Sequence, residues 1–300
     1  MIHGLAVYED QLFVLTCRPN RILVYNCTNF TLNREISIDK VESPQCMDIC
    51  ASNKCLYISD FVSRSVYKLP VSDERRMTSW EVSDKPRGIS VNRDTNVLVI
   101  IERKKCIEEY TPSGEMVRRI PHREIARPWH CVQLDTGKYV VCHGSGPTDQ
   151  HRVCLIDPTD RVIGLYGSQP GGENNQLNWP NYLALDSRNN IAVSDRENKR
   201  IQLLDSSLTW FATISQLPNG RSFSKLRALC IDDVRGRLYV GQFNGMVHIL
   251  TYSIKPATWI LNSSVAERNI DSWLELTLSR SISRMHAAKV ILSREFMTLQ

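Results

Sequence analysis

The chain has 300 residues, of which 42% are hydrophobic and 23% are charged, an ordinary globular composition that excludes disordered and fibrous classes. Its 37 Lys and Arg and 32 Asp and Glu leave a formal net charge of +5, too small by itself to indicate a partner. No stretch approaches the roughly 18 to 20 apolar residues of a membrane span, and the N-terminus lacks the apolar core of a secretory signal. We therefore expect a cytoplasmic protein with no membrane partner.

Ten cysteines are the one unusual feature of the composition. Most lie inside apolar runs such as 140–142, and free cysteine packs well in protein cores, so we expect buried thiols in a reducing compartment. Cys46, Cys50 and Cys55 are closest together, but they have neither the Cys-x-x-Cys spacing nor a neighbouring histidine that zinc sites use. The sequence therefore predicts no metal and no cofactor.

A pattern of short apolar runs recurs six times along the chain. Each unit opens on Pro or an apolar residue, and the six openings are Ile2, Pro44, Pro86, Pro128, Pro180 and Leu226. Three further runs follow each opening, at 12–15, 21–25 and 35–38 in the first unit, separated by turn residues that indicate tight connections between strands. Units of about 40 to 50 residues with four strands each are typical of propeller blades. The sequence therefore predicts an all-β fold, a six-bladed β-propeller with four antiparallel strands per blade, over residues 1–261.

The two ends of the predicted ring each supply a complete blade. The first unit begins with its innermost strand and the sixth has its own outermost candidate at 257–261, so we expect closure by side-chain packing and not by a shared strand. Residues 262–300 contain no Pro or Gly, open with a capping-box pattern from Ser264 to Glu267, and space apolar residues at helical intervals. This pattern predicts a C-terminal amphipathic helical extension or tail, to which the sequence assigns no role.

The fifth unit carries the most specific motif. It reads LNWPNYLALD over 177–186 and IAVSDRENKRIQ over 191–202, preceded by a glycine-rich segment at 166–172. This motif resembles the NHL repeat, and the chain is similar to the C-terminal propeller of tripartite-motif (TRIM) proteins. The resemblance implies a non-catalytic propeller that binds RNA or protein partners, with ubiquitin-pathway partners among them.

An enzymatic alternative comes from the same family, which includes a peptidyl-hydroxyglycine lyase. In that enzyme a zinc-binding histidine directly follows the residue that opens a blade, and its chemistry needs a zinc held by imidazoles. The corresponding positions here are His3, Gln45, Arg87, Trp129, Asn181 and Arg227. Because only one is a histidine, we expect no lyase activity and find no other catalytic constellation. His130 and His143 are expected near the channel as hydrogen-bonded structural residues.

Charge is unevenly divided between the two ends of the predicted ring. The loops joining second to third strands, and those joining one blade to the next, emerge at one end and carry 18 Lys and Arg against 7 Asp and Glu. The loops at the opposite end carry 9 Lys and Arg against 13 Asp and Glu. A surface of one sign attracts polyanions and speeds their encounter. The basic end is therefore the candidate binding face.

Aromatic residues near the blade openings accompany these cations, a combination that suits unpaired bases of single-stranded RNA. We therefore predict an interaction module that binds single-stranded RNA. One open alternative is an acidic protein surface, recruited for example as the substrate of a ubiquitin ligase whose catalytic domains lie elsewhere. The other is structural: the tryptophans pack between blades, the arginines keep the surface soluble, and Arg200 serves an inter-blade hydrogen bond. The candidate binding residues are Arg21, Arg64, Lys85, Arg87, Arg103, Lys104, Lys105, Arg127, Trp129, Arg152, Trp179, Tyr182, Arg196, Lys199, Arg200 and Arg227.

Overall fold

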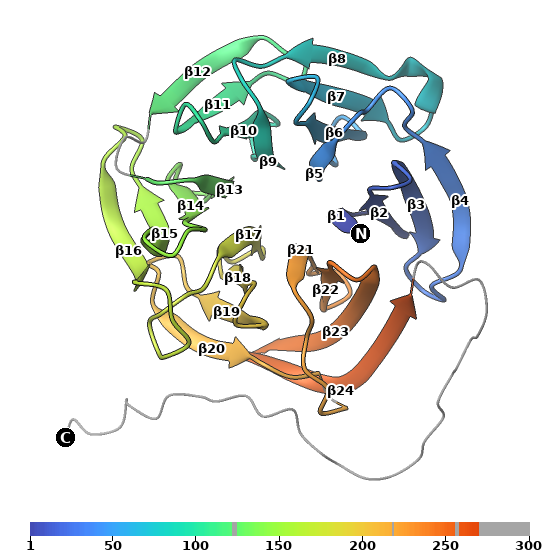
Figure 1. Ribbon diagram of the computed structural model, residues 1–300. Helices are drawn as coiled ribbons and strands as arrows, with labels where there is room; N and C mark the ends of the chain where they lie inside the picture. The colour runs from blue at the N-terminus through green and yellow to red at the C-terminus, as the bar shows by residue number, and fades with distance from the viewer. Residues whose placement is uncertain (122–124, 218, 256–257, 270–300) are drawn as a thin grey trace, which may run out of the picture.

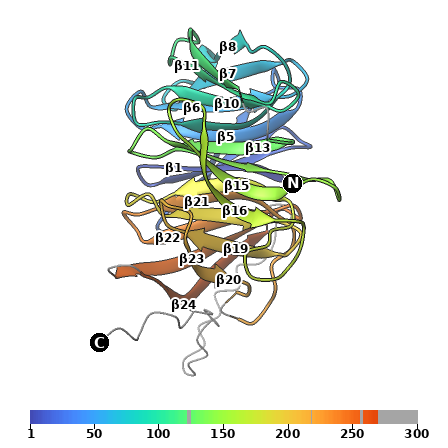
Figure 2. The same ribbon diagram turned by 90° about the vertical axis from the view of Figure 1, so that its left-hand side faces the viewer.

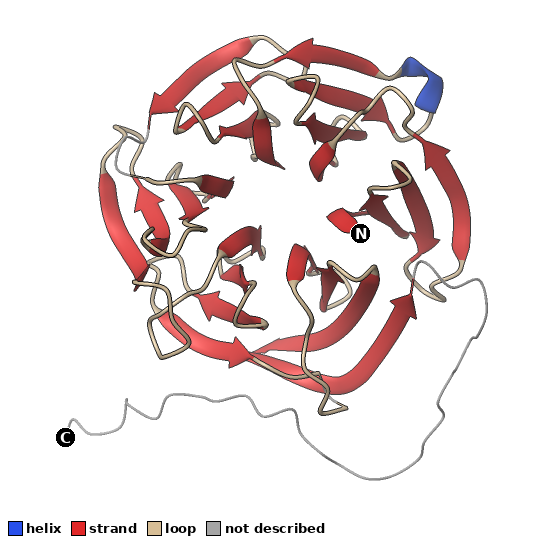
Figure 3. Cartoon of the chain, in the orientation of Figure 1, coloured by secondary structure: helices blue, strands red, loops and turns tan. Residues whose placement is uncertain are grey.

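The computed structural model describes residues 1–121, 125–217, 219–255 and 258–269. These residues form six four-stranded antiparallel sheets around a central channel (Figure 1). Within each sheet the strands follow chain order from the channel outward. Figure 3 shows that the described chain is built almost entirely of strands, with one short 3-10 helix, η1 (Glu74–Arg76). The predicted six-bladed β-propeller is thus confirmed.

The first three blades occupy residues 2–121, and each opens at the residue predicted from the repeat. Blade one comprises β1 (Ile2–Tyr8), β2 (Gln11–Thr16), β3 (Arg21–Asn26) and β4 (Leu32–Ser37). Blade two comprises β5 (Pro44–Cys50), β6 (Cys55–Asp60), β7 (Ser65–Pro70) and β8 (Thr78–Glu81). Blade three comprises β9 (Pro86–Val91), β10 (Val97–Ile101), β11 (Cys106–Tyr110) and β12 (Met116–Pro121).

The remaining three blades complete the ring, and their openings are also the predicted ones. Blade four comprises β13 (Pro128–Gln133), β14 (Tyr139–His143), β15 (His151–Ile156) and β16 (Val162–Ser168). Blade five comprises β17 (Pro180–Leu185), β18 (Ile191–Asp195), β19 (Arg200–Leu204) and β20 (Trp210–Ile214). Blade six comprises β21 (Leu226–Asp232), β22 (Arg237–Gln242), β23 (Met246–Lys255) and β24 (Thr258–Asn269).

The core lies between neighbouring blades, which stack around the ring as Figure 2 shows from the side. The second strands are the most apolar runs in the sequence because both of their faces are covered; β6 and β10 are buried along their whole lengths. The outermost strands face solvent on one side, and β4 accordingly alternates exposed with more buried residues. The hydrophobic pattern of each unit therefore follows the distance of its strands from the channel.

The ring closes between blades six and one without a shared strand, as predicted. A Cβ added at Gly241 of β22 would lie 2.7 Å from Ile2 Cγ2, so the two blades touch closely here. Arg235 strengthens the junction because its guanidinium binds Asp232 of its own blade at 3.0 Å and Asp10 of blade one at 3.1 Å. Side-chain packing and an ion pair thus replace strand exchange at this seam.

The last strand is longer than predicted. β24 pairs with β23 along its length, from Thr258 opposite Lys255 to Asn269 opposite Met246. The predicted capping box at 264–267 therefore lies in a strand, because the open edge of β23 supplies backbone partners to residues whose local pattern also permits a helix start. The propeller accordingly extends beyond residue 261, and the remainder of the predicted helix, from residue 270, lies outside the described residues.

The ten cysteines carry free thiols. Eight are buried and two, Cys17 and Cys230, are partly buried. Burial raises the pKa of the Cys46 thiol to about 11, which keeps it protonated and unreactive at neutral pH.

Within the described ranges, no helix is long and apolar enough to cross a membrane.

Candidate binding face and channel mouth

The strand registers fix which loops share a face. Ile2, the first residue of β1, lies opposite Thr16, the last of β2, while Arg21, the first of β3, lies opposite Ser37, the last of β4. First strands therefore begin at the same end of the ring as the loops joining second to third strands and the loops joining successive blades. We call this end the mouth face and the opposite end the far face. The mouth face is the end for which the sequence predicts the basic excess.

A β-bulge opens the first strand of every blade. In blade one, Ile2 pairs with Thr16 and Gly4 pairs with Leu15, so that His3 is left out of the ladder. The same register shift occurs in the other five blades. A bulge bends the strand and redirects the side chain of the extra residue. The second residue of each first strand is left out of its ladder, joined by Gly88 in blade three; these second residues are His3, Gln45, Arg87, Trp129, Asn181 and Arg227.

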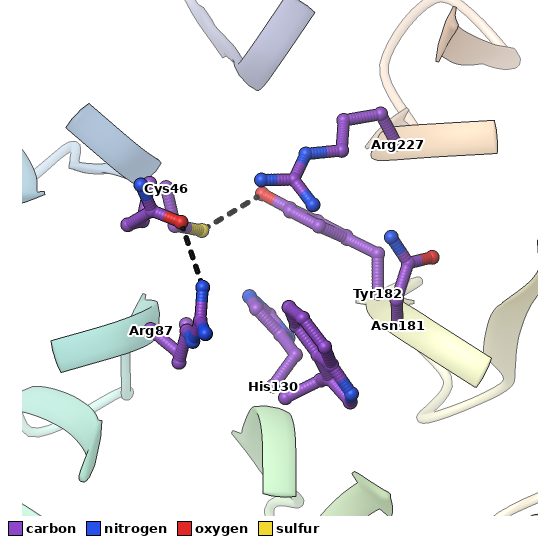
Figure 4. Close-up of a pocket in the computed structure, with 9 residues that line it drawn as sticks. Cys46, Arg87, His130, Asn181, Tyr182 and Arg227 are labelled. Carbon is purple, nitrogen blue, oxygen red and sulfur yellow. Dashed lines mark hydrogen bonds between the residues drawn. The ribbon is translucent and has the colours of Figure 1, made fainter. Parts of the chain in front are cut away.

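Five of these six residues line a pocket at the mouth of the central channel (Figure 4). The pocket is small, with an enclosed volume of about 20 Å³. Arg87 and Arg227 point into it from different blades, and Arg87 Nη1 donates a hydrogen bond to Gln45 Oε1 at 3.2 Å. The full lining is Gln45, Cys46, Arg87, Gly88, Trp129, His130, Asn181, Tyr182 and Arg227.

Tyr182 forms the floor of this pocket. It lies one residue deeper along β17 than Asn181, and its hydroxyl reaches across the ring to blade two, 3.6 Å from Cys46 Sγ and 3.4 Å from the carbonyl oxygen of Met47. His130 stacks on the tyrosine ring with centroids 4.2 Å apart. With 6% of its surface exposed, Tyr182 is not the surface aromatic that the sequence predicts for stacking on a base. It closes the channel.

The histidines around the channel are neutral structural residues. Burial lowers the pKa of His130 and of His143 to about 4. His130 Nε2 bonds the carbonyl oxygen of Ile89 in the neighbouring blade at 3.1 Å. Burial, with the charge of Arg227 beside it, lowers the pKa of His3 to about 3, so that Nδ1 accepts a hydrogen bond from Arg227 Nη2 at 3.4 Å. Groups of three or more His, Cys, Asp or Glu residues positioned to hold a metal do not occur within the described part of the chain.

Cationic and aromatic side chains alternate beside the pocket over blades two to five. Arg87 lies over Phe61 at 4.5 Å and over Trp129 at 4.8 Å, measured from the guanidinium carbon to the ring centroid. Trp129 contacts Trp179 at 5.7 Å between centroids, and Arg196 lies over Trp179 at 4.3 Å. We call Phe61, Arg87, Trp129, Trp179 and Arg196 the cation–aromatic arc. Lys85 adds a second cation over Phe61 at 4.7 Å.

Several of the predicted cations are held by carboxylates. Arg21 pairs with Glu35 at 3.0 Å, Arg87 with Glu102 at 2.8 Å, and Arg127 with Asp149 at 3.5 Å. Glu102 and Asp149 belong to the counted loops, so only Glu35, in β4, lowers the positive charge of the mouth face below the difference that the loop residues give.

Arg200 has a structural role. Its Nε binds the fully buried carboxylate of Asp195 at 2.7 Å, and its other nitrogens donate to the carbonyl oxygens of Gly172, Glu173 and Gln176. It thus ties the loop between blades four and five to β18. This agrees with the alternative that assigns Arg200 a hydrogen bond between blades.

Other predicted cations form no ion pair with a described residue. Arg64, Lys105 and Lys199 are exposed, and each takes a positive φ of 50–54° at the last position of its loop between second and third strands. Arg103 and Lys104 are exposed beside Lys105. Arg152 is half-buried, with its Nε unpaired. The structure therefore leaves a group of exposed cations on the loops, and Arg227 at the channel beside Arg87 and Arg196, which lie close to carboxylates.

The structure also adds residues to the site that the sequence did not suggest as binding residues. Gln45 and Asn181 belong to the pocket with Cys46 and His130. Gln45 and Asn181 hold the second position of their units, so the repeat shows that their positions correspond. The sequence does not show the bulge at that position, which turns their side chains toward the pocket.

Comparison with solved structures gives the same fold at low sequence identity. The chain is similar to a structure of Kuenenia stuttgartiensis hydrazine synthase (TM-score 0.62, 12% identity, 90% of this chain and 96% of that chain). It is similar to virginiamycin B lyase from Staphylococcus aureus (0.60, 11%, 90% and 85%) and to the WD40 repeats of RRP9 (0.61, 11%, 87% and 79%). No protein-family model and no curated protein sequence matches the chain. The chain is therefore a six-bladed β-propeller with a cationic pocket at the mouth of its channel.

Proposed function

We propose that this propeller is a non-catalytic interaction module of the NHL type that binds single-stranded RNA on its mouth face. The cation–aromatic arc carries the proposal. Its arginines supply charge for phosphates, and its indoles offer flat apolar surface for bases, the combination that single-strand binding proteins use. A non-catalytic role is supported by the mouth itself, where a single histidine occupies the six bulge positions.

The exposed loop cations extend this surface outward. Arg103, Lys104 and Lys105 lie together on the loop between β10 and β11, on the same face as the arc. Contacts between such side chains and phosphates release counterions, so binding weakens steeply as salt is added. The free thiols of the chain fit a reducing, cytoplasmic location for this activity.

Fluorescence anisotropy with a labelled single-stranded RNA tests the proposal. We expect the affinity to fall with salt and the double variant Arg103→Glu, Lys104→Glu to bind at least about tenfold more weakly. The matched control is Lys54→Glu, Arg188→Glu, which reverses two exposed cations on loops of the far face and should bind as the wild type does. Equal affinity in both double variants, or affinity independent of salt, would show that the mouth face does not bind RNA.

A second candidate is a protein partner on the same face. Val62 and Phe243 are 52% and 44% exposed on the loops between second and third strands of blades two and six. Large apolar side chains exposed on binding loops are typical of protein contacts. Partners retained by the wild type after nuclease treatment, and lost in Val62→Ser, Phe243→Ser, would favour protein recruitment, including recruitment for a ubiquitin ligase.

A further inference from the structure

The channel mouth holds more positive charge than its surroundings balance. Arg227 forms no ion pair with any carboxylate of the described chain, and its one hydrogen-bond partner is the neutral ring of His3. Burial, together with the nearby charges of Arg196 and Arg87, lowers the pKa of Arg227 to about 10. The guanidinium nevertheless stays charged at neutral pH. A cation held in this way is stabilised when an anion enters beside it.

The neighbouring arginines are only partly neutralised. Arg87 is paired with Glu102, but Arg196 lies 3.6 Å from Glu197, beyond a hydrogen bond, and that carboxylate is shared with Lys225 at 3.1 Å. The Nε of Arg196 is buried without a hydrogen-bond partner. The indole N–H groups of Trp129 and Trp179 are buried and unpaired in the same way. Donors without acceptors thus accompany the cations around the mouth.

The shape of the pocket selects the kind of anion. Tyr182 spans the channel beneath the pocket, on the side away from the mouth face. The middle of an RNA strand would have to enter and leave the pocket through its opening on the mouth face, whereas the end of an RNA strand only has to enter. A terminal phosphate also carries a charge of about −1.5 to −2 at neutral pH and three acceptor oxygens, while an internal phosphodiester carries a single charge. Two or more guanidinium groups therefore complement the charge and acceptors of a terminal phosphate better than those of a phosphodiester.

We propose that the pocket formed by Arg227, Arg87 and the side-chain amide of Asn181 binds the terminal phosphate of a single-stranded RNA whose body lies on the mouth face. This inference rests on the proposed function for the identity of the ligand, but the anion pocket itself does not. Arg227 supplies one charge, Arg87 supplies a second from across the channel, and the cation–aromatic arc receives the nucleotides that follow the phosphate.

The test compares two oligonucleotides of one sequence, with a 5′-phosphate and with a 5′-hydroxyl, and uses inorganic phosphate alone as a third probe. Isothermal titration calorimetry should show at least about tenfold tighter binding of the phosphorylated strand, equivalent to about 1.4 kcal/mol. In Arg227→Gln this preference should disappear while the hydroxylated strand binds as before. Thermal unfolding shows whether the variant folds, and we expect its midpoint to equal or exceed that of the wild type because an unpaired buried charge is removed.

Each outcome separates this inference from the proposed function. If both strands bind equally to the wild type, the terminal-phosphate site is wrong although RNA binding stands. If neither strand binds but inorganic phosphate binds the wild type and not Arg227→Gln, the anion pocket is supported and the RNA assignment is overturned. A 3′-phosphorylated strand distinguishes the two ends of the RNA, and equal preference for either end supports recognition of the phosphate alone. Arg188→Gln, an exposed substitution on the far face, should retain the preference for the phosphorylated strand.

Discussion

The hydroxyl of Tyr182 lies 3.6 Å from the sulfur of Cys46, although the two residues belong to blades on opposite sides of the ring. The contact spans the channel beneath the cationic pocket at the mouth face. It also makes Tyr182 a brace between blades that do not otherwise adjoin. Both consequences can be tested by shortening this one side chain.

We predict that Tyr182→Ala lowers the free energy of unfolding by about 3 to 5 kcal/mol, because it removes a buried aromatic ring and leaves a cavity beneath the pocket. Tyr182→Phe keeps the ring and its stacking on His130 and loses only the hydroxyl contacts, at a cost of about 1 kcal/mol. Denaturant unfolding of the two variants measures the difference. Equal losses in both would show that the ring does not brace the channel.

The repeat predicted the blades because packing in a propeller requires a regular pattern of apolar runs in the sequence. Second strands such as β6 and β10 are buried on both faces and read as continuous apolar runs, and the residue that opens each first strand begins that strand in all six blades. The channel mouth was harder to predict. A bulge depends on the register between two strands, and no residue type marks it in the sequence. That Gln45 and Asn181 both turn toward the pocket can therefore be known only from the strand pairing.

Other features depended on partners distant in sequence. The count of loop charges predicted the basic face but missed the carboxylate that pairs with Arg21, because Glu35 lies on strand β4 and not in a loop. Tyr182 looked like a surface aromatic because nothing in its own repeat shows that the opposite blade is within reach. Local periodicity likewise favoured a helix at 264–267, where the edge of β23 provides a strand partner.

Gly88 makes the closest approach between two blades near the pocket. A Cβ added there would lie 2.4 Å from the carbonyl oxygen of Trp129 and 2.7 Å from the Cα of His130, both backbone atoms that cannot move aside. We predict that Gly88→Ala destabilises the protein by about 1 to 3 kcal/mol and disturbs the pocket. Gly172→Ala is the control, since its nearest neighbour would be 3.8 Å away. Thermal unfolding compares the two, and similar midpoints would contradict the tight approach.

Glu108 is fully buried between blades two and three and is held by Arg119 at 2.7 Å and by the hydroxyl of Tyr110 at 2.7 Å. We predict that Glu108→Gln costs about 2 to 3 kcal/mol at neutral pH, because the guanidinium and hydroxyl lose a charged acceptor. Glu35→Gln, which breaks the more exposed pair with Arg21, should cost less than about 1 kcal/mol.

The pH dependence of this effect has a definite sign. Burial raises the pKa of Glu108, but hydrogen bonds from Ser83, Tyr110 and Arg119 outweigh it and hold the pKa below its usual value. The carboxylate therefore stabilises the fold above the unfolded-state pKa, and this contribution is lost as the pH falls through the folded-state pKa. The difference between wild type and Glu108→Gln should shrink on acidification below about pH 4.5. A difference that stays constant down to acid denaturation would contradict the assignment.

Asp48 shows the opposite behaviour beneath the floor of the pocket. Burial raises its pKa to about 6, although the backbone N–H groups of Val91 and Ile49 both donate to it at 2.8 Å. Among the described residues it forms no ion pair, and the groups that face it include Cys230, Cys46 and Tyr182, none of them a cation. Because the folded state holds its proton more tightly than the unfolded state, the stability of the wild type should fall as the pH rises from about 4 to about 6.

Asp48→Asn removes this titration and keeps an oxygen that accepts a backbone hydrogen bond. We therefore predict that the variant gains stability relative to the wild type as the pH rises through this interval, by at most about 3 kcal/mol between pH 4 and pH 7. Unfolding by urea at both pH values measures the gain. Tyr182→Phe provides the matched comparison, since it alters the floor without changing a charge and should shift stability equally at both pH values. A gain for Asp48→Asn that is the same at pH 4 and pH 7 would mean that the carboxylate is not desolvated, and that water reaches it from the far face.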